Sequence, residues 1–149
     1  MAQLSRPERG VRIRAVQQLA QAKDQDTAQL LSSVLEHDED RVVRGNAAAA
    51  LGEIKGGSAV TLLARALEDE AVSVRLNAVR ALGKIGSEEA VEILGDILLD
   101  HPDRRLRWLA ARTLGEQRCE GSRRFLEEAA LDSDHTVRKE VDQSLAQWQ

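Results

Sequence analysis

The sequence repeats itself about every 31 residues, and this periodicity constrains the fold more than any other feature. The segment VRGNAAAALGEI, which begins at Val43, returns as VRLNAVRALGKI and as LRWLAARTLGEQ. Weaker copies are VRIRAVQQLAQA near the start of the chain and VRKEVDQSLAQW near its end. The five copies begin at residues 11, 43, 74, 106 and 137, so they are separated by 32, 31, 32 and 31 residues. A near-constant period of this length indicates stacked structural units.

Each copy predicts a first helix, and in four copies a second helix follows. The apolar residues of the second copy share one face of a helix at the spacing of Val43, Ala47, Leu51 and Ile54. A glycine-containing break comes next in the three central copies, and then a second apolar-periodic segment. These second segments are anchored by leucines with the same period: Leu31, Leu63, Leu94 and Leu126. The spacing of the anchors places the extra residues in the loops that lead into the second and fourth copies.

Small residues fill positions on the first helices where a core would normally carry large side chains. Ala47, Ala48, Ala50 and Gly52 lie in one copy, and Gly83 and Gly115 are equivalents of Gly52. A glycine costs a helix about 1 kcal/mol relative to alanine, so close packing of neighbouring backbones must offset that loss. The chain also has no Tyr, one Phe and two Trp. The composition therefore fits closely stacked helices with an aliphatic core.

These copies resemble a known family. The pattern VR..AA.ALG.I, followed by paired leucines and a terminal aspartate, is similar to the short HEAT-like repeat first described in phycobilin-lyase subunits. The resemblance covers residues 7 to 149. It implies an all-α solenoid with a right-handed superhelix, with first helices on the convex side and second helices on the concave side. It also implies a role as an interaction scaffold, and in some members a role in chromophore lyases.

We delimit a single domain, residues 1–149, made of four helix pairs and a terminal capping helix. The repeats span about 7–37, 38–69, 70–100 and 101–132, and a half-repeat spans 133–149. Both ends have the character of caps. Asp142 stands where the other copies carry an aliphatic residue, and Trp148 replaces an isoleucine. A carboxylate at that position is tolerated only where no further repeat covers it.

One arginine follows the first apolar residue of every copy: Arg12, Arg44, Arg75, Arg107 and Arg138. Acidic residues recur on the same period in the loops between repeats: Asp38, Asp69, Asp100 and Asp132. We predict a structural ladder in which each arginine pairs with the acid of the loop before it, because forked arginine–carboxylate bonds suit repeated fixing of one unit to the next. The alternative is a stripe of free arginines that binds anions.

Nothing in the sequence predicts catalysis, a metal or a cofactor. The histidines His37, His101 and His135 fall in separate loops, where three or four ligands do not converge. Cys119 is the single cysteine, which excludes an internal disulfide and fits a reducing compartment. No apolar stretch is long enough for a signal peptide core or a membrane span. We therefore expect a non-enzymatic, cytoplasmic protein that is a monomer or weak dimer.

Two surfaces are candidates for binding a partner. The first is the concave face, for which we predict Gln29, Ser33, Thr61, Arg65, Glu68, Glu92, Asp96, Leu99, Arg124 and Glu128, together with Ser32, Glu36, Ala64, Gly95, Glu127 and Leu131. Its six acids against two arginines favour a basic or neutral protein or peptide. The second surface is Trp108 and Leu109, which lie off the core periodicity beside Arg104, Arg105 and Arg112. Tryptophan and arginine are the residues typical of interface hot spots.

Two other functions remain open. The family resemblance suggests a subunit or relative of a phycobilin lyase, but a flat tetrapyrrole needs apolar and aromatic walls. Only Phe125, Trp108 and Trp148 supply rings. The arginine-rich fourth repeat suggests nucleic-acid binding, which a net charge of −4 and an acidic groove disfavour.

Overall fold

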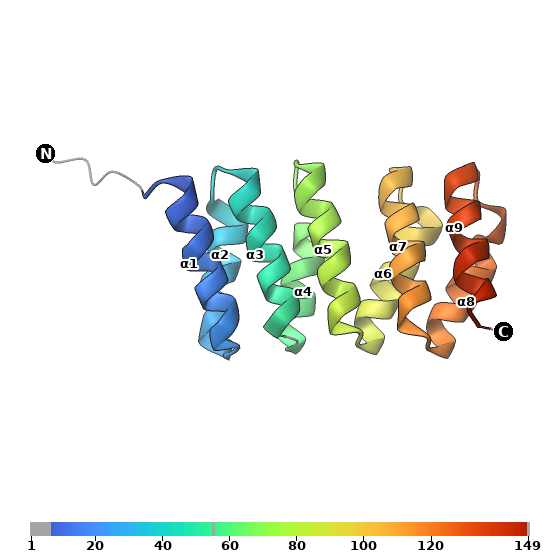
Figure 1. Cartoon of the computed structure of the whole chain (residues 1–149), viewed down its shortest axis with the longest axis horizontal. Helices are drawn as coiled ribbons and strands as arrows, with labels where there is room; N and C mark the ends of the chain where they lie inside the picture. Colours follow the sequence, from blue (N-terminus) through green and yellow to red (C-terminus); the bar gives the residue numbers. More distant parts are fainter. Residues whose placement is uncertain (1–6, 55, 149) are drawn as a thin grey trace, which may run out of the picture.

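The computed structural model describes residues 7–54 and 56–148, and across this part of the chain every regular element is helical. Figure 1 shows the helices stacked in order along one axis, with the two termini at opposite ends. The elements are α1 (Arg9–Ala22), α2 (Gln25–His37), α3 (Arg41–Ile54), α4 (Gly57–Ala66), α5 (Val72–Ile85), α6 (Glu88–Asp100), α7 (Arg104–Gln117), α8 (Glu120–Glu128), the 3₁₀ turn η1 (Ala129–Leu131) and α9 (His135–Ala146). The predicted α-solenoid of four helix pairs and a terminal helix is confirmed.

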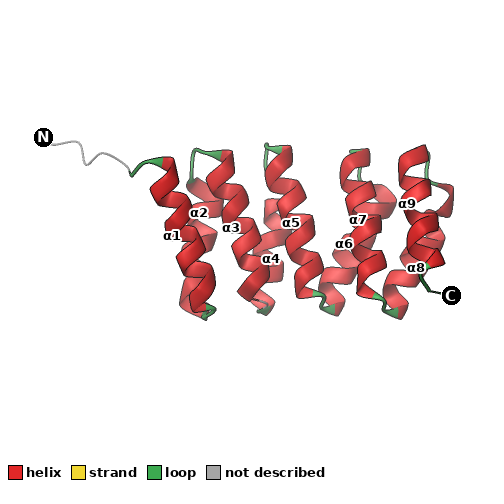
Figure 2. Cartoon of the chain, viewed as in Figure 1, coloured by secondary structure: helices red, strands yellow, loops and turns green. Residues whose placement is uncertain are grey.

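The helices form two layers. The first helices α1, α3, α5, α7 and α9 stand side by side, and the second helices α2, α4, α6 and α8 lie behind them (Figures 1 and 2). The core lies between the layers, where the leucines that anchor the second helices are fully buried. Burial of each such side chain contributes about 1.5–3 kcal/mol. At the C-terminal end Asp142 is exposed and Trp148 is half-buried.

Small residues bring successive first helices together, as their pattern predicts. A Cβ placed on Gly52 would lie 2.9 Å from the Cα of Ala81 on the next first helix. A Cβ on Gly115 would lie 2.5 Å from the Oγ of Ser144, and Gly83 is covered by the side chain of Thr113. The lost helix propensity at these glycines is therefore offset by close packing between repeats, against backbone at Gly52 and against side chains at Gly83 and Gly115.

The alternation of 31 and 32 residues is absorbed where each second helix ends. After α2 and α6, where the connection is one residue longer, the last turn keeps α-helical hydrogen bonding. The amides of Asp38 and His101 donate to carbonyls four residues earlier, at 3.0 and 3.1 Å. In the shorter connections the final turn tightens, and the amides of Asp69 and Asp132 donate to carbonyls only three residues earlier, at 3.2 and 3.0 Å. The four amides reach equivalent carbonyls, so the loops keep the same position on every repeat.

The stacking is uneven along the solenoid. Helices α5 and α7 contact each other less than α3 and α5 do, and Figure 1 shows their wider separation. Side-chain size explains the difference. A Cβ on Gly45 would lie 2.8 Å from the Nδ2 of Asn77, so α3 and α5 meet closely. The equivalent pair between α5 and α7 is Leu76 and Leu109, and Thr113 replaces the alanine that faces Gly52.

Candidate partner-binding surfaces

The periodic arginines form the predicted ladder, with a different choice of partner. Arg44 donates from Nε and Nη2 to the two carboxylate oxygens of Asp69, at 2.9 and 3.1 Å. Its Nη1 donates to the backbone carbonyl of Asp38 at 2.9 Å. The loop before the arginine thus supplies a carbonyl, and the carboxylate comes from the loop after the second helix. The expected pairing with the acid of the preceding loop is wrong, because the guanidinium spans both loops.

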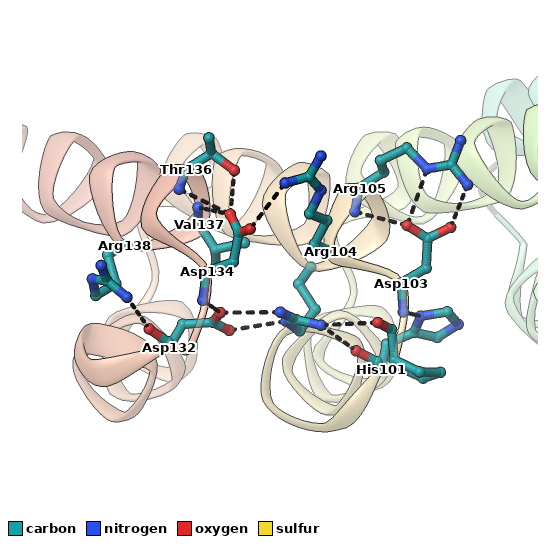
Figure 3. Close-up of polar contacts among 11 residues, drawn as sticks. His101, Asp103, Arg104, Arg105, Asp132, Asp134, Thr136, Val137 and Arg138 are labelled. Atoms are coloured by element: carbon teal, nitrogen blue, oxygen red, sulfur yellow. Dashed lines mark hydrogen bonds and ion pairs between the residues drawn. The ribbon is translucent and has the colours of Figure 1, made fainter.

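The same geometry recurs along the molecule. Arg12 pairs with Asp38, and Arg107 pairs with Asp132, each through Nε at 2.9 Å. Figure 3 shows the loops around Asp132 and His101 that the second of these bridges joins. Only 8 % of the Arg44 side chain is exposed, and the other two guanidinium groups are also largely covered. Paired, covered arginines do not offer the free stripe that anion binding would need.

The ladder is interrupted at the third repeat. His101 occupies the position that holds an aspartate in the other loops. Asp100, which was predicted from the sequence to belong to the ladder, lies one residue before that position and is exposed. The His101 Nδ1 accepts the backbone N–H of Asp103 at 3.0 Å, as the ladder aspartates accept the amide two residues later. An imidazole ring provides no carboxylate, however. The Nε of Arg75 is buried and has no partner among the residues that the structure describes.

Aspartates at the starts of α7 and α9 are held in their charged form. A hydrogen bond from the Arg105 guanidinium lowers the pKa of Asp103 to about 2. A hydrogen bond from the Thr136 hydroxyl is the largest cause that lowers the pKa of Asp134, and Arg104 adds to it (Figure 3). Carboxylates at helix N-termini are also favoured by the helix dipole.

The second-helix face carries most of the predicted partner-binding side chains at the surface. By this name we mean the outward positions of α2, α4, α6 and α8 and the turns that follow them. Leu99 is half-buried, whereas the other nine predicted residues are exposed: Gln29, Ser33, Thr61, Arg65, Glu68, Glu92, Asp96, Arg124 and Glu128. Two expectations are wrong, since Ser32 and Gly95 are buried. Gly95 lies directly under the ring of Phe125, which leaves no room for a side chain there.

Both arginines of this face are paired across repeats. Arg65 of α4 contacts Glu36 of α2 at 3.1 Å, and Arg124 of α8 contacts Glu92 of α6 at 3.2 Å. Each ion pair therefore joins neighbouring second helices. Of the predicted carboxylates on this face, three have no side-chain partner within residues 7–54 and 56–148: Glu68, Asp96 and Glu128. The face is therefore acidic after its internal pairs are counted.

Two hollows on this face have apolar side chains beside the free carboxylates. One, of about 180 Å³, lies between α2 and α4 and is lined by Leu62 and Glu68. The other, of about 460 Å³, lies between the ends of α6 and α8 and is lined by Leu99 and Glu128. Leu131 stands at its edge with 92 % of its surface exposed. The smaller hollow can accept an aliphatic side chain next to a negative charge, whereas the larger one offers Leu99 and Leu131 within a mostly polar lining that includes His101 and Asp132.

The Trp108 surface differs from its prediction. Leu109 is only 6 % exposed and Trp108 is half-buried, so both side chains fill the wide contact between α5 and α7. The guanidinium of Arg112 lies 5.7 Å from the centre of the Trp108 ring. Sequence reasoning missed Leu76 and Arg80 of α5, which line the same surface. Their equivalence to Trp108 and Arg112 by one repeat is the signal that could have found them.

The remaining candidate groups are separate from one another. The described residues contain no cluster of three or more His, Cys, Asp or Glu side chains that could hold a metal. Cys119 is exposed, with its Sγ 3.2 Å from the Ser122 hydroxyl. No helix among the described residues has the length and apolar character to span a bilayer.

Comparisons with known proteins place this architecture. A family model for HEAT repeats matches residues 1–72, 29–105 and 59–146. No curated protein matches the sequence. Among solved structures, human deoxyhypusine hydroxylase in complex with glycerol is 24 % identical with a TM-score of 0.71, over 81 % of this chain and 43 % of that one. The complex of CpcE and CpcF of phycocyanin lyase from Nostoc sp. PCC7120 is 20 % identical with a TM-score of 0.69, over 99 % of this chain and 62 % of that one.

An engineered protein is also similar, at 24 % identity and a TM-score of 0.57, over 96 % of this chain and 75 % of that one. The chain spans less than two thirds of the hydroxylase and of the lyase chain that it matches. At these identities the likeness concerns the fold. The family model, by contrast, covers nearly the whole sequence in three overlapping matches, and the chain belongs to the HEAT-repeat family.

Proposed function

We propose that the chain is a non-enzymatic scaffold that binds a basic segment of a partner protein on its second-helix face. The observation that carries this proposal is the set of free carboxylates Glu68, Asp96 and Glu128. They come from three consecutive repeats, so an extended segment that crosses the second helices can meet all three. Solenoids use such extended surfaces for binding.

Apolar contacts on the same face supply affinity that surface charges alone do not. Exposed ion pairs typically contribute about 0.2–1 kcal/mol each, whereas a buried aliphatic side chain contributes about 1.5–3 kcal/mol. The hollow beside Glu128 is bordered by Leu99 and the exposed Leu131. A lysine- or arginine-rich segment with interspersed aliphatic residues therefore fits this face best. The HEAT-like structure of phycocyanin lyase, which contains CpcE and CpcF together, supports a protein as the partner.

The two alternatives find less support. Phe125 of α8 is buried against Gly95 of α6, so the described part of the second-helix face offers no aromatic wall to a tetrapyrrole. Most arginines of the fourth repeat are paired with acids, among them Arg104, Arg105, Arg107 and Arg123. Those acids would oppose the phosphates of a nucleic acid.

The proposal is tested with fluorescein-labelled peptides and fluorescence anisotropy. We compare a peptide of alternating lysine and leucine with its glutamate and leucine counterpart. The triple variant Glu68→Gln, Asp96→Asn, Glu128→Gln should weaken binding of the basic peptide at least about tenfold and lower its salt dependence. A control variant removes three exposed carboxylates on or next to the first helices, Glu8→Gln, Glu116→Gln and Asp142→Asn, and should bind as the native chain does.

Equal loss in the two variants would mean that only total charge matters, and the proposal would fail. It would also fail if the basic and acidic peptides bound the native chain equally well. The same variants, used as bait in lysate from the protein's own source, then identify the physiological partner as the protein that the native and control chains retain and the triple variant loses.

A further inference from the structure

A groove on the opposite layer carries features that the second-helix face does not explain. Two hollows, of about 460 and 500 Å³, lie along the wide contact between α5 and α7. They adjoin, because Arg80, Trp108 and Leu109 line both of them. One extends to the starts of these helices and to Thr136 of α9, and the other extends to Lys84 and Glu116 near their ends. We call the two together the α5–α7 groove.

The floor of the groove is apolar. Leu76 and Trp108 are half-buried, and Leu109 lies beneath them in the core. The groove exists because these side chains and Thr113 are larger than the residues that join α3 to α5. Trp108 thus presents part of a large ring to solvent at the bottom of a depression, which is the usual position of an interface anchor.

The rim of the groove is cationic in a chain whose net charge is −4. Five basic side chains line the hollows, against the single acid Glu116: Arg80, Lys84, Arg104, Arg105 and Arg112. Four of the five contact carboxylates, as Arg104 contacts Asp134 at 3.3 Å and Arg112 contacts Glu116 at 3.7 Å. The side chains of these four cations are more than half exposed. Such surface pairs are weak, so an incoming carboxylate can replace the internal one.

Arg80 occupies the centre of this arrangement. It lines both hollows and its only described side-chain contact is a long hydrogen bond to the Oδ1 of Asn77, at 3.4 Å. No carboxylate of the described chain pairs with it. A guanidinium beside a half-buried indole can bind a carboxylate of a ligand while the ring packs against the ligand's neighbouring apolar side chain.

We propose that the α5–α7 groove binds an acidic peptide segment in which one large apolar side chain is flanked by aspartate or glutamate. The apolar side chain packs against Trp108 and Leu76, and the flanking carboxylates meet Arg80, Arg112 and the arginines at the start of α7. Helix α7 has 14 residues, or about 21 Å, which an extended segment of about seven residues spans. This site is separate from the second-helix face, since it lies on the other layer and selects the opposite charge.

Charge spacing favours a peptide over a nucleic acid here. Duplex DNA places a phosphate about every 1.7 Å along its axis, so phosphates would fall beside Glu116, Asp103 and Asp134 as well as beside the cations. A peptide carries carboxylates only at chosen positions and can leave those acids uncontacted. A depression with an apolar floor also suits a single side chain better than a phosphate track.

The test uses three fluorescein-labelled probes and fluorescence anisotropy. The first is a peptide of about eight residues with one leucine among glutamates, the second replaces its glutamates by glutamine, and the third is a short random DNA duplex. The variant Arg80→Gln, Arg112→Gln should bind the acidic peptide at least about tenfold more weakly. The control Arg14→Gln, Arg41→Gln removes two exposed arginines elsewhere and should bind it as the native chain does.

A second readout reports on the ring itself. Trp108→Leu places at this position the residue that the preceding repeat carries, which favours an intact fold. Binding of the acidic peptide should change the intrinsic tryptophan fluorescence of the native chain and of Trp148→Phe, but not that of Trp108→Leu. Circular dichroism melts establish that each variant is folded.

Several results would overturn the proposal: equal binding of the glutamine peptide, equal loss in the control variant, or displacement of the peptide by the duplex at lower concentration. The last would identify a nucleic-acid surface instead. The triple variant of the second-helix face should retain binding of the acidic peptide. Failure of either site is therefore distinguishable from failure of the other.

Discussion

At the scale of single residues, His101 shows how much of the ladder depends on charge. Its ring accepts the amide of Asp103 and so preserves the turn, but it leaves the Nε of Arg75 buried and unpartnered. A buried donor without an acceptor costs about 1–3 kcal/mol. Among the described residues, the Arg75 guanidinium donates only to the backbone carbonyls of Asp69 and Glu70. Because of this one side chain, the third repeat lacks the arginine–carboxylate bridge that Arg12, Arg44 and Arg107 form in the other repeats.

We predict that His101→Asp restores the bridge and raises the free energy of unfolding by about 1–2 kcal/mol at neutral pH, because a charge-assisted bond replaces a desolvated donor. Urea unfolding followed by circular dichroism measures the change. The control is the same substitution in an Arg75→Met background, where the gain should disappear. An equal gain in both backgrounds would show that the aspartate acts on its own loop and not on Arg75.

At the scale of helices, the distance between neighbours follows the size of a few facing residues. Gly52 against Ala81 brings α3 and α5 together, whereas Leu76 against Leu109 holds α5 and α7 apart. Protein interiors are packed densely enough that one added methyl group is felt. The open groove at α5–α7 and the tight contact at α3–α5 are therefore two results of the same packing rule.

Gly52→Ala should lower the free energy of unfolding by about 1–3 kcal/mol, because its Cβ would meet the backbone of Ala81 and force α3 and α5 apart. Gly57→Ala is the matched control. It changes the same atoms in the first turn of α4, where nothing lies within 4 Å of the new Cβ. Greater helix propensity should there raise stability by up to about 1 kcal/mol. Thermal melts of the two variants should therefore shift in opposite directions, and similar shifts would contradict the packing argument.

At the scale of the whole molecule, the pH dependence of folding stability is set by carboxylates in the loops between repeats, both where a loop begins and where the next first helix starts. Burial opposes the charged form of Asp69, but the hydrogen bonds from the Arg44 guanidinium and the Ala71 amide, together with the charges of Arg44 and Arg75, lower its pKa on balance. The pKa of Asp103 falls to about 2, and that of Asp134 also falls. A lowered pKa in the folded state means that the unfolded chain binds protons more readily. These groups stabilise the fold above the unfolded aspartate value, near pH 4, and lose that effect as the pH falls further.

We predict a free energy of unfolding that is nearly constant from about pH 8 to pH 5 and declines steeply from about pH 4 towards pH 2. Chemical denaturation across this range measures it. Asp103→Asn keeps a good helix cap but cannot titrate. It should be less stable at neutral pH and should lose less stability on acidification. A decline as steep as that of the native chain would show that Asp103 does not contribute.

The architecture was predictable because a local pattern repeats. The spacing of Val43 and its equivalents established the helix pairs, and the small residues around Gly52 indicated close stacking. The ladder partners were not predictable in full, since the sequence does not reveal that a guanidinium spans two loops, nor that Asp100 lies one residue off register. Leu109 was expected at the surface because it lies off the core periodicity of the first helices. Its burial follows from the wider α5–α7 contact, a property of two neighbouring helices together.

The arginine ladder also bears on how such a chain can change over evolutionary time. Arg44 contacts a carboxylate 25 residues later, and Arg12 contacts one 26 residues later, in each case in the loop that leads into the next unit. If an ancestral gene gained or lost one whole unit, the arginines on each side of the junction would still face a carboxylate at that separation. Growth by tandem duplication therefore requires no new pairing to arise, and families built in this way can vary in length while every internal junction keeps the same chemistry.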